Sequence, residues 1–385
     1  MKVVRTCNAI YPDDIGGPGI HCFELSLRQT ANRMKVSVIV PRKSADLPFH
    51  ERVVDSFEIF RLPSPWQPWS VLGMTNPYLP TLPAIVSGLR PSLVHAHSHL
   101  FLMNFQAIIA ARRLGIPSIV TVHGVFAQRD LFTNLVQFGY ISTFSSWMMA
   151  QSSRIICLTH SDAALIRRFG VDQDKIRIIP NGINTDLFKP GTEDEGNILW
   201  VGRFVPEKGL GTLVEAARIV CREKSLVKFT LIGEGPLKDN IISLVRKSGL
   251  TDKVRILPRM SQPEVAKMMA SCELFAFPSV REGFPKTVLE AMSCGKPIVA
   301  SDLPCLNEAF DHEHAGILVP RQNAQEFAKA TMELLEDKGL RRKLGDRGRH
   351  LALAKYNWSV IAKQIENVYA EALVTGPQSS KTALH

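Results

Sequence analysis

Two carboxylates, Glu282 and Glu290, stand eight positions apart in the segment Arg281-Glu-Gly-Phe-Pro-Lys-Thr-Val-Leu-Glu290. The apolar run 274–279 before them predicts a short buried strand, and Pro285 suits the first turn of a helix, where a missing N–H costs no hydrogen bond. The free N–H groups at the start of such a helix favour an anion. A phosphate flanked by two carboxylates that bind hydroxyls describes a sugar nucleotide. The alternative is that Glu282 and Glu290 are a solvated loop residue and an exposed helix residue.

Two cations, Arg203 and Lys208, flank a turn that leads into a helix expected to begin near Gly211. Cations beside a helix N-terminus suit the two phosphates of a diphosphate, although they can also be ordinary surface residues. If they neutralise a departing diphosphate, the reaction requires no divalent cation.

Two other patterns bear on metal binding. His95, His97 and His99 alternate at strand period, but no carboxylate or cysteine lies near them in the sequence. Asp172-Gln-Asp174 has the spacing with which metal-dependent sugar transferases hold a nucleotide diphosphate, but it lies far from the glycine loops and resembles turn chemistry. We therefore expect neither a metal nor another cofactor.

Apolar strand-like runs alternate with amphipathic helical stretches twice along the chain, which predicts an α/β protein with two Rossmann-like parallel-sheet domains. We expect domain boundaries at 1–180 plus 359–385 and at 190–358, because Asn181-Gly182 and the polar stretch 191–196 mark a connection. The predicted strands are 3–10, 35–40, 58–62, 93–96, 118–122 and 154–158, then 197–201, 227–232, 254–257, 274–278 and 297–301.

Glycine and polar residues follow these strands at the ends where parallel sheets bind ligands. The first half contributes Gly16-Gly-Pro-Gly-Ile-His21, His97 and His123-Gly124, and the second half contributes Gly202-Arg203, Gly233-Glu-Gly235 and Glu282. These residues are expected to converge on a cleft between the domains. The first glycine loop lacks the Gly-x-Gly-x-x-Gly spacing of dinucleotide-binding proteins, which disfavours NAD.

Composition limits the function classes. The chain has 385 residues, a net charge of +10, and no apolar signal-peptide core near its N-terminus. The positive charge calls for an anionic partner, yet no nucleic-acid module is visible, so nucleic acid is not expected. Seven cysteines without a Cys-x-x-Cys pair indicate reduced core thiols. We expect a cytoplasmic protein that can contact the inner membrane face.

Several segments together resemble the retaining glycosyltransferases of family 4, which have the GT-B fold. They are Gly16-Gly-Pro-Gly-Ile-His21, Thr121-Val-His123-Gly, Ile179-Pro-Asn-Gly-Ile183, Val201-Gly-Arg203-Phe-Val-Pro-Glu-Lys208-Gly, Gly233-Glu-Gly-Pro236 and Glu282-Gly-Phe-Pro through Glu290-Ala-Met-Ser-Cys-Gly-Lys-Pro297. The resemblance implies metal-independent transfer, with retention, of a sugar from a nucleotide diphosphate donor. We expect a hexose-type sugar, a GDP- or UDP-sugar as its donor, and a glycan or lipid-linked acceptor. The alternatives are a nucleotide-sugar epimerase on the same fold and a non-catalytic nucleotide-sugar binding protein.

The resemblance also implies roles for individual residues. Arg203 and Lys208 would stabilise the departing diphosphate, Glu282 would hold hydroxyls of the transferred sugar, and His123 would contact that sugar near the acceptor. The donor-binding set would comprise Gly16, Gly17, Gly202, Gly233, Gly283, Phe284, Pro285, Lys286, Thr287 and Glu290, with Glu290 on the nucleotide ribose.

Two departures from the family pattern stand out. Many relatives have a small residue or Asn where this chain has Lys286. The stretch Leu303-Pro-Cys-Leu-Asn-Glu308 replaces a Gly-Gly-x-x-Glu pattern. The acceptor side is expected in the first domain, where the aromatic stretches 62–83 and 125–149 suit sugar rings or a membrane surface, or else anchor the core.

Overall fold

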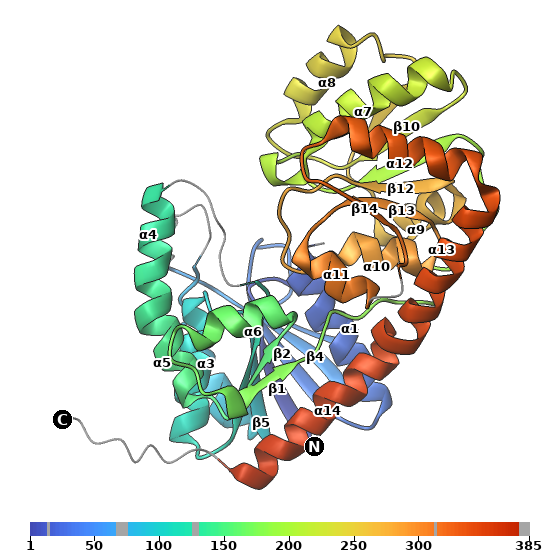
Figure 1. Ribbon diagram of the computed structural model, residues 1–385. Coiled ribbons are helices and arrows are strands. Elements are labelled where there is room, and N and C mark those ends of the chain that lie inside the picture. The colour runs from blue at the N-terminus through green and yellow to red at the C-terminus, as the bar shows by residue number, and fades with distance from the viewer. Residues whose placement is uncertain (14–15, 67–75, 125–130, 312–313, 377–385) are drawn as a thin grey trace. The chain divides into compact units, whose positions relative to one another are not determined.

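The computed structural model describes residues 1–13, 16–66, 76–124, 131–311 and 314–376, with no side-chain description for 131–134. The chain divides into two compact units: Met1–Asn181 together with Trp358–His385, and Gly182–Asn357 (Figure 1). The second unit is therefore inserted between the two segments that form the first.

The sheet of the first unit has the strand order β3-β4-β2-β1-β5-β6-β7-β8. Every neighbouring pair is parallel except β3 and β4, which are antiparallel. The strands are β1 (Lys2–Thr6), β2 (Lys35–Pro41), β3 (His50–Val54), β4 (Phe57–Leu62), β5 (Leu93–His97), β6 (Ser118–Val122), β7 (Arg154–Cys157) and β8 (Ile176–Ile178).

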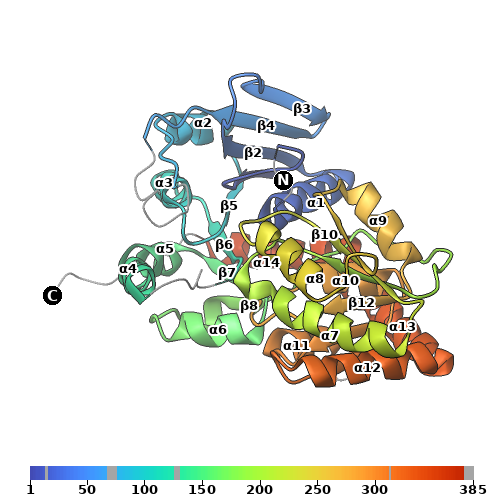
Figure 2. The same ribbon diagram turned by 90° about the horizontal axis from the view of Figure 1, so that it is seen from above.

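Helices cover both faces of this sheet (Figure 2). Val3 of β1 packs toward α1 (Gly17–Ala31) and α14 (Trp358–Thr375), whereas Val4 packs toward α2 (Leu82–Leu89) and α3 (Leu102–Arg113). This alternation follows from the two-residue period of a strand that is buried on both faces. The remaining helical segments are α4 (Leu131–Tyr140), a π-helical turn (Ile141–Ser145), α5 (Ser146–Gln151), α6 (His160–Arg167) and a 3₁₀ turn (Gln173–Lys175).

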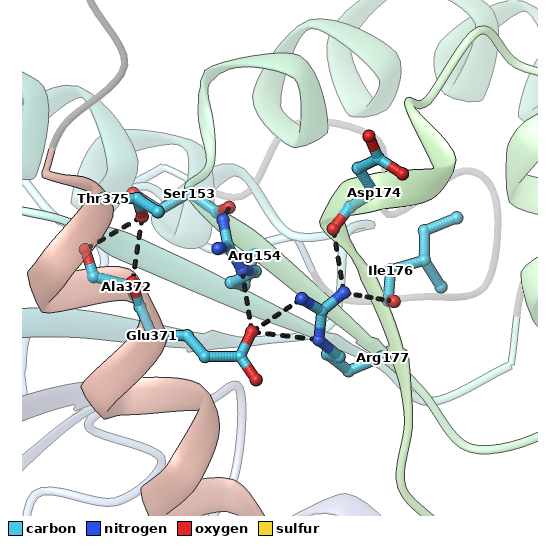
Figure 3. Close-up of polar contacts among 8 residues, drawn as sticks. All are labelled: Ser153, Arg154, Asp174, Ile176, Arg177, Glu371, Ala372 and Thr375. Carbon is cyan, nitrogen blue, oxygen red and sulfur yellow. Dashed lines mark hydrogen bonds and ion pairs between the residues drawn. The ribbon is translucent and has the colours of Figure 1, made fainter.

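Helix α14 is attached to the far edge of the sheet by an ionic contact (Figure 3). Oε2 of Glu371 accepts from Nε of Arg154 on β7 at 3.2 Å and from Nη2 of Arg177 on β8 at 2.6 Å. Arg177 also donates through Nη1 to the backbone oxygens of Asp174 and Ile176, at 2.8 and 3.0 Å. The guanidinium group of Arg177 is thus held by the backbone of its own segment as well as by the carboxylate of Glu371.

The second unit contains a fully parallel sheet with the order β11-β10-β9-β12-β13-β14. Its strands are β9 (Asn197–Val201), β10 (Lys228–Ile232), β11 (Val254–Leu257), β12 (Leu274–Phe277), β13 (Ile298–Ser301) and β14 (Ile317–Val319). Its helices are α7 (Leu210–Glu223), α8 (Lys238–Lys247), α9 (Gln262–Ser271), α10 (Lys286–Ser293), α11 (Pro304–Phe310), α12 (Ala324–Glu336) and α13 (Lys338–Leu351), with a 3₁₀ turn (Pro206–Lys208) and a π-helical turn (Ala352–Tyr356).

Two apolar layers enclose this second sheet. Trp200 and Phe229 lie in the layer formed with α7, α8 and α12, and Phe275 and Phe277 lie in the layer formed with α9, α10 and α11. The prediction of two parallel-sheet α/β domains is confirmed. The structure also has three strands that we did not predict, β3, β8 and β14, and its first strand ends at Thr6 rather than at residue 10.

Candidate active site

An ion pair joins two strand ends of the second unit. Lys208 ends the 3₁₀ turn after β9, and Glu282 lies in the loop after β12. Because β9 and β12 are adjacent and parallel, their following loops emerge at the same edge of the sheet. Nζ of Lys208 contacts Oε1 of Glu282, and the two side chains are 18% and 15% exposed. Ser279 donates its hydroxyl to the same Oε1 at 3.2 Å, which orients the carboxylate.

Arg203 lies in the same loop region, two residues after β9 ends. Its side chain is exposed and has no polar partner among the described residues. The structure thus brings Lys208 and Glu282 into contact and leaves the Arg203 guanidinium group available to an anion.

A second ion pair lies at the start of α10. Helix α10 begins at Lys286, so Pro285 is its N-cap. The sequence had suggested instead that Pro285 lies in the first turn of the helix. Nζ of Lys286 is 3.6 Å from Oε1 of Glu290, one helical turn further on. Glu290 is buried, and burial raises the pKa of its carboxyl group even though Lys286 opposes the shift. The cation that departs from the family pattern therefore partners the carboxylate predicted to bind ribose.

The glycines of this unit allow its strand ends to approach one another. A Cβ at Gly233, whose φ is +149°, would lie 1.8 Å from the carbonyl oxygen of Gly202. A Cβ at Gly209 would lie 2.0 Å from the carbonyl oxygen of Pro278. Close backbone packing is thus sufficient to explain Gly233 and Gly209, and the role of Gly202 and Gly233 in donor binding stays a prediction. A cavity of about 620 Å³ borders the same loop along Val205, Gly209 and α8.

Gly283, Phe284 and Thr287, also predicted to bind the donor, lie around the beginning of α10. Gly283 is exposed, whereas Phe284 and Thr287 are half-buried. The ring of Phe284 packs at 6.1 Å from that of Tyr356, which fixes one side of the loop. These residues border the helix N-terminus where an anion is expected.

In the first unit, histidines gather at the corresponding edge of the sheet. His21 is on α1, His97 is the last residue of β5, and His123 directly follows β6. Nδ1 of His97 is 3.2 Å from Nε2 of His123. The ring of His21 is 5.4 Å from that of His97 and 4.9 Å from that of His123, measured between centroids. Nδ1 of His21 is 2.9 Å from Oδ1 of Asn181.

His97 and His123 are neutral at physiological pH. Burial lowers the pKa of His97 well below its ordinary value, and repulsion from His95, His21 and His123 adds to the effect. The pKa of His123 is lowered by enclosure in the protein and then by His21 and His99. His123 can therefore donate or accept a hydrogen bond, but it carries no charge toward a ligand.

His95 does not belong to this group. Its Nδ1 is 2.7 Å from the hydroxyl of Tyr369 on α14, and its Nε2 is 2.7 Å from the hydroxyl of Thr121. It is part of the interior, so the strand-period pattern of His95, His97 and His99 does not form one site. Sequence reasoning missed His21, which lies within a motif that we noted only for its glycines.

Gly16 and Gly17 form the N-terminus of α1, with Gly16 as its N-cap. A Cβ at Gly17 would meet no described residue within 4 Å, so none of the described residues fills the space beside Gly17. Asp172 and Asp174, the other metal-binding candidates, form a turn in which Oδ1 of Asp172 accepts from the Asp174 N–H at 3.0 Å, as expected. The seven cysteines are free thiols, six of them buried.

Comparisons with known proteins identify the family to which this chain is similar. Residues 183–351 match the family model described as "Glycosyl transferases group 1", and residues 15–187 match "Glycosyltransferase Family 4". An uncharacterized glycosyltransferase of Methanocaldococcus jannaschii is 30% identical over 282 residues, which are 72% of this chain and 75% of the relative. The D-inositol 3-phosphate glycosyltransferase of Salinispora tropica is 26% identical over 94% of this chain and 82% of its own length.

Solved structures show the same fold. Sucrose-phosphate synthase from Thermosynechococcus elongatus superimposes with a TM-score of 0.80 at 22% identity, covering 97% of this chain and 99% of that one. The Anabaena protein HepE, solved in complex with UDP-glucose, gives a TM-score of 0.74 at 19% identity and covers 96% of this chain and all of its own. The two parallel-sheet units define a GT-B glycosyltransferase fold. The chain belongs to the glycosyl transferases group 1, family 4.

Proposed function

We propose that this protein is a retaining glycosyltransferase that moves a hexose-type sugar from a UDP- or GDP-sugar to a glycan or lipid-linked acceptor without a divalent cation. The observation that carries the proposal is the contact between Lys208 and Glu282 at the strand ends of the second unit, next to the exposed Arg203. A cation and a carboxylate at one point suit a sugar phosphate, in which the phosphate is bonded to the anomeric carbon of a ring that carries hydroxyl groups.

The chemistry follows from charge. Breaking the bond between the sugar and the phosphate leaves negative charge on the nucleotide diphosphate. Lys208 and Arg203 stabilise that charge, and the start of α10 adds backbone N–H groups. With two cations on the leaving group, transfer proceeds without a metal ion. The departing phosphate then removes the proton of an acceptor hydroxyl that attacks from the same face, which retains the configuration at the anomeric carbon.

The two carboxylates bind the sugar and the ribose of the donor. Glu282, oriented by Ser279, accepts hydrogen bonds from hydroxyls of the transferred sugar. Glu290 accepts from the ribose, since a buried carboxylate gains most from a ligand that supplies donors. His123 contacts the sugar near the acceptor. The relatives support a nucleotide sugar as donor, because HepE was solved in complex with UDP-glucose.

The acceptor side is proposed on the surface of the first unit that is formed by α3, α4, the π-helical turn and α5, which lie side by side (Figures 1 and 2). Among the side chains that the structure describes there, the exposed apolar ones are Leu135, Phe138, Phe144 and Trp147. Arg112 and Arg113 border a hollow of about 390 Å³ beside Trp147. No helix within the described residues is long and apolar enough to cross a membrane. We propose that this surface rests on an anionic membrane that presents a lipid-linked acceptor.

The donor is tested by thermal unfolding of the purified protein with UDP-, GDP- and ADP-sugars in the presence of EDTA. A ligand that binds the folded state alone raises the unfolding temperature by mass action, so we expect one nucleotide series to stabilise the protein without metal. No shift with any of them would count against the donor site. The membrane contact is tested by co-sedimentation with phosphatidylglycerol vesicles. Equal binding to neutral vesicles would exclude an electrostatic contribution to membrane binding.

A further inference from the structure

The three histidines at the sheet edge of the first unit have a feature that the transfer reaction does not use. One ring nitrogen each of His21, His97 and His123 lies within 4.8 Å of the other two. They come from three separate segments: α1, the end of β5 and the residue after β6. Their convergence is therefore a product of the fold, not of local sequence.

The spacing of one pair in the group matches a tetrahedral ion. Nδ1 of His97 and Nε2 of His123 are 3.2 Å apart. Two imidazole nitrogens that share a tetrahedral zinc ion at roughly 2.0–2.1 Å are about 3.3 Å apart. A direct hydrogen bond between the two rings has the same length, so this distance alone fits either arrangement and the third ring decides between them.

The third ring is held in place from outside the group. Nδ1 of His21 is 2.9 Å from Oδ1 of Asn181. An amide oxygen accepts only, so Nδ1 carries the proton and Nε2 carries the lone pair. Ligating histidines commonly have such a partner, which fixes both the tautomer and the ring orientation.

We propose that His21, His97 and His123 bind one zinc ion, with a water molecule as the fourth ligand. Three imidazoles suit Zn²⁺, Cu²⁺ or Ni²⁺ and do not suit Mg²⁺, which requires oxygen ligands. The ion is not the metal of a nucleotide-diphosphate site, since the charge of the departing diphosphate is assigned to Lys208 and Arg203 of the other unit. A bound zinc ion would occupy His123 and so suppress sugar transfer. This suppression rests on the proposed function, whereas zinc binding itself does not.

The test uses the metal-free full-length protein titrated with ZnCl₂ in competition with a chromogenic zinc chelator. We expect one zinc ion per chain, and visible d–d absorption typical of tetrahedral Co²⁺ when cobalt replaces zinc. His97→Gln and His21→Gln each remove one ligand and should weaken binding by at least ~100-fold, since even outer-shell changes cost 10- to 100-fold. His350→Gln is the matched control, because His350 is an exposed histidine of the second unit.

If either His97→Gln or His21→Gln fails to fold, the other variant still tests the proposal. Circular dichroism shows which of the two variants is folded. Unchanged zinc affinity in a folded His97→Gln or His21→Gln protein, or a cobalt spectrum without tetrahedral bands, would overturn the site and leave a simple hydrogen bond between His97 and His123. Magnesium should not compete. Binding is measured without a nucleotide sugar, so its failure is separate from any failure of the donor to bind.

Discussion

Replacing Glu371 by Gln tests how the last helix is attached to the first sheet. The change keeps the size of the side chain and removes the charge that Arg154 and Arg177 share. Glu371 is 39% exposed, so solvent screens the contact, and an exposed ion pair contributes up to about 1 kcal/mol. Because Arg177 is already held by two backbone oxygens, less side-chain entropy opposes the contact. We therefore expect a loss of about 1 kcal/mol.

The assay is native-state hydrogen exchange of the α14 backbone, analysed by mass spectrometry of peptides from this helix. A loss of 1 kcal/mol increases the population of the open state about fivefold, and exchange of α14 should accelerate by that factor. Glu366→Gln is the control, because Glu366 lies on the same helix and accepts from the neutral amide of Asn32 at 2.9 Å. The control should change exchange by less than about twofold.

The effect must also depend on pH. The hydrogen bonds from Arg177 and Arg154 lower the pKa of Glu371 in the folded protein. Its contribution is therefore fully present above the pKa of the unfolded chain and is lost as pH falls through the folded pKa. Exchange in wild type and Glu371→Gln, corrected for intrinsic rates, should converge at acid pH. Equal exchange at neutral pH would refute the view that this contact holds α14.

Three further outcomes are expected. Lys208→Ala should lower turnover by about 100- to 1000-fold in a transfer assay, and Lys238→Ala, which breaks a comparable pair with Glu234, should leave it unchanged. Gly233→Ala should cost about 3 kcal/mol or more in denaturant unfolding, because its Cβ meets a backbone oxygen at positive φ, whereas Gly211→Ala, in open space on α7, should be neutral or stabilising. Glu290→Gln should raise the melting temperature, because burial raises the pKa of Glu290 and its ionisation at neutral pH therefore costs stability. The same change should weaken nucleotide binding about tenfold, as measured by calorimetry. Tighter binding would contradict the ribose role.

Sequence patterns predicted every strand that is buried on both faces, because continuous apolar runs mark them, and also the partly buried β4 and β11. The strands that we missed lack this signal. β3 has the sequence His-Glu-Arg-Val-Val and alternates between exposed and half-buried at the sheet edge. β8 and β14 are three residues each, too short for a pattern to emerge. The first strand was predicted too long because the apolar and polar residues after Thr6 pack in a loop rather than continue the ladder.

The candidate site was predictable only in part for a similar reason. The types and strand-end positions of Lys208 and Glu282 are visible in the sequence, but their contact spans 74 residues and depends on β9 and β12 being neighbours. The histidines show the same limit. The alternation of His95, His97 and His99 suggests one group, whereas the fold turns His95 into the core and brings His21 from a helix to meet His97.

The division of the chain has a consequence for its synthesis. The first unit is completed by Trp358–His385, which follows the whole of the inserted unit. Until α14 emerges from the ribosome, Val3, Leu93 and Ile119 have no Trp358, Ile361 or Ile365 to cover them. The inserted unit is contiguous and can close first, so the earliest-made strands wait the longest with an apolar face open to water. Nascent chains paused before residue 358 should therefore be strong clients of holding chaperones.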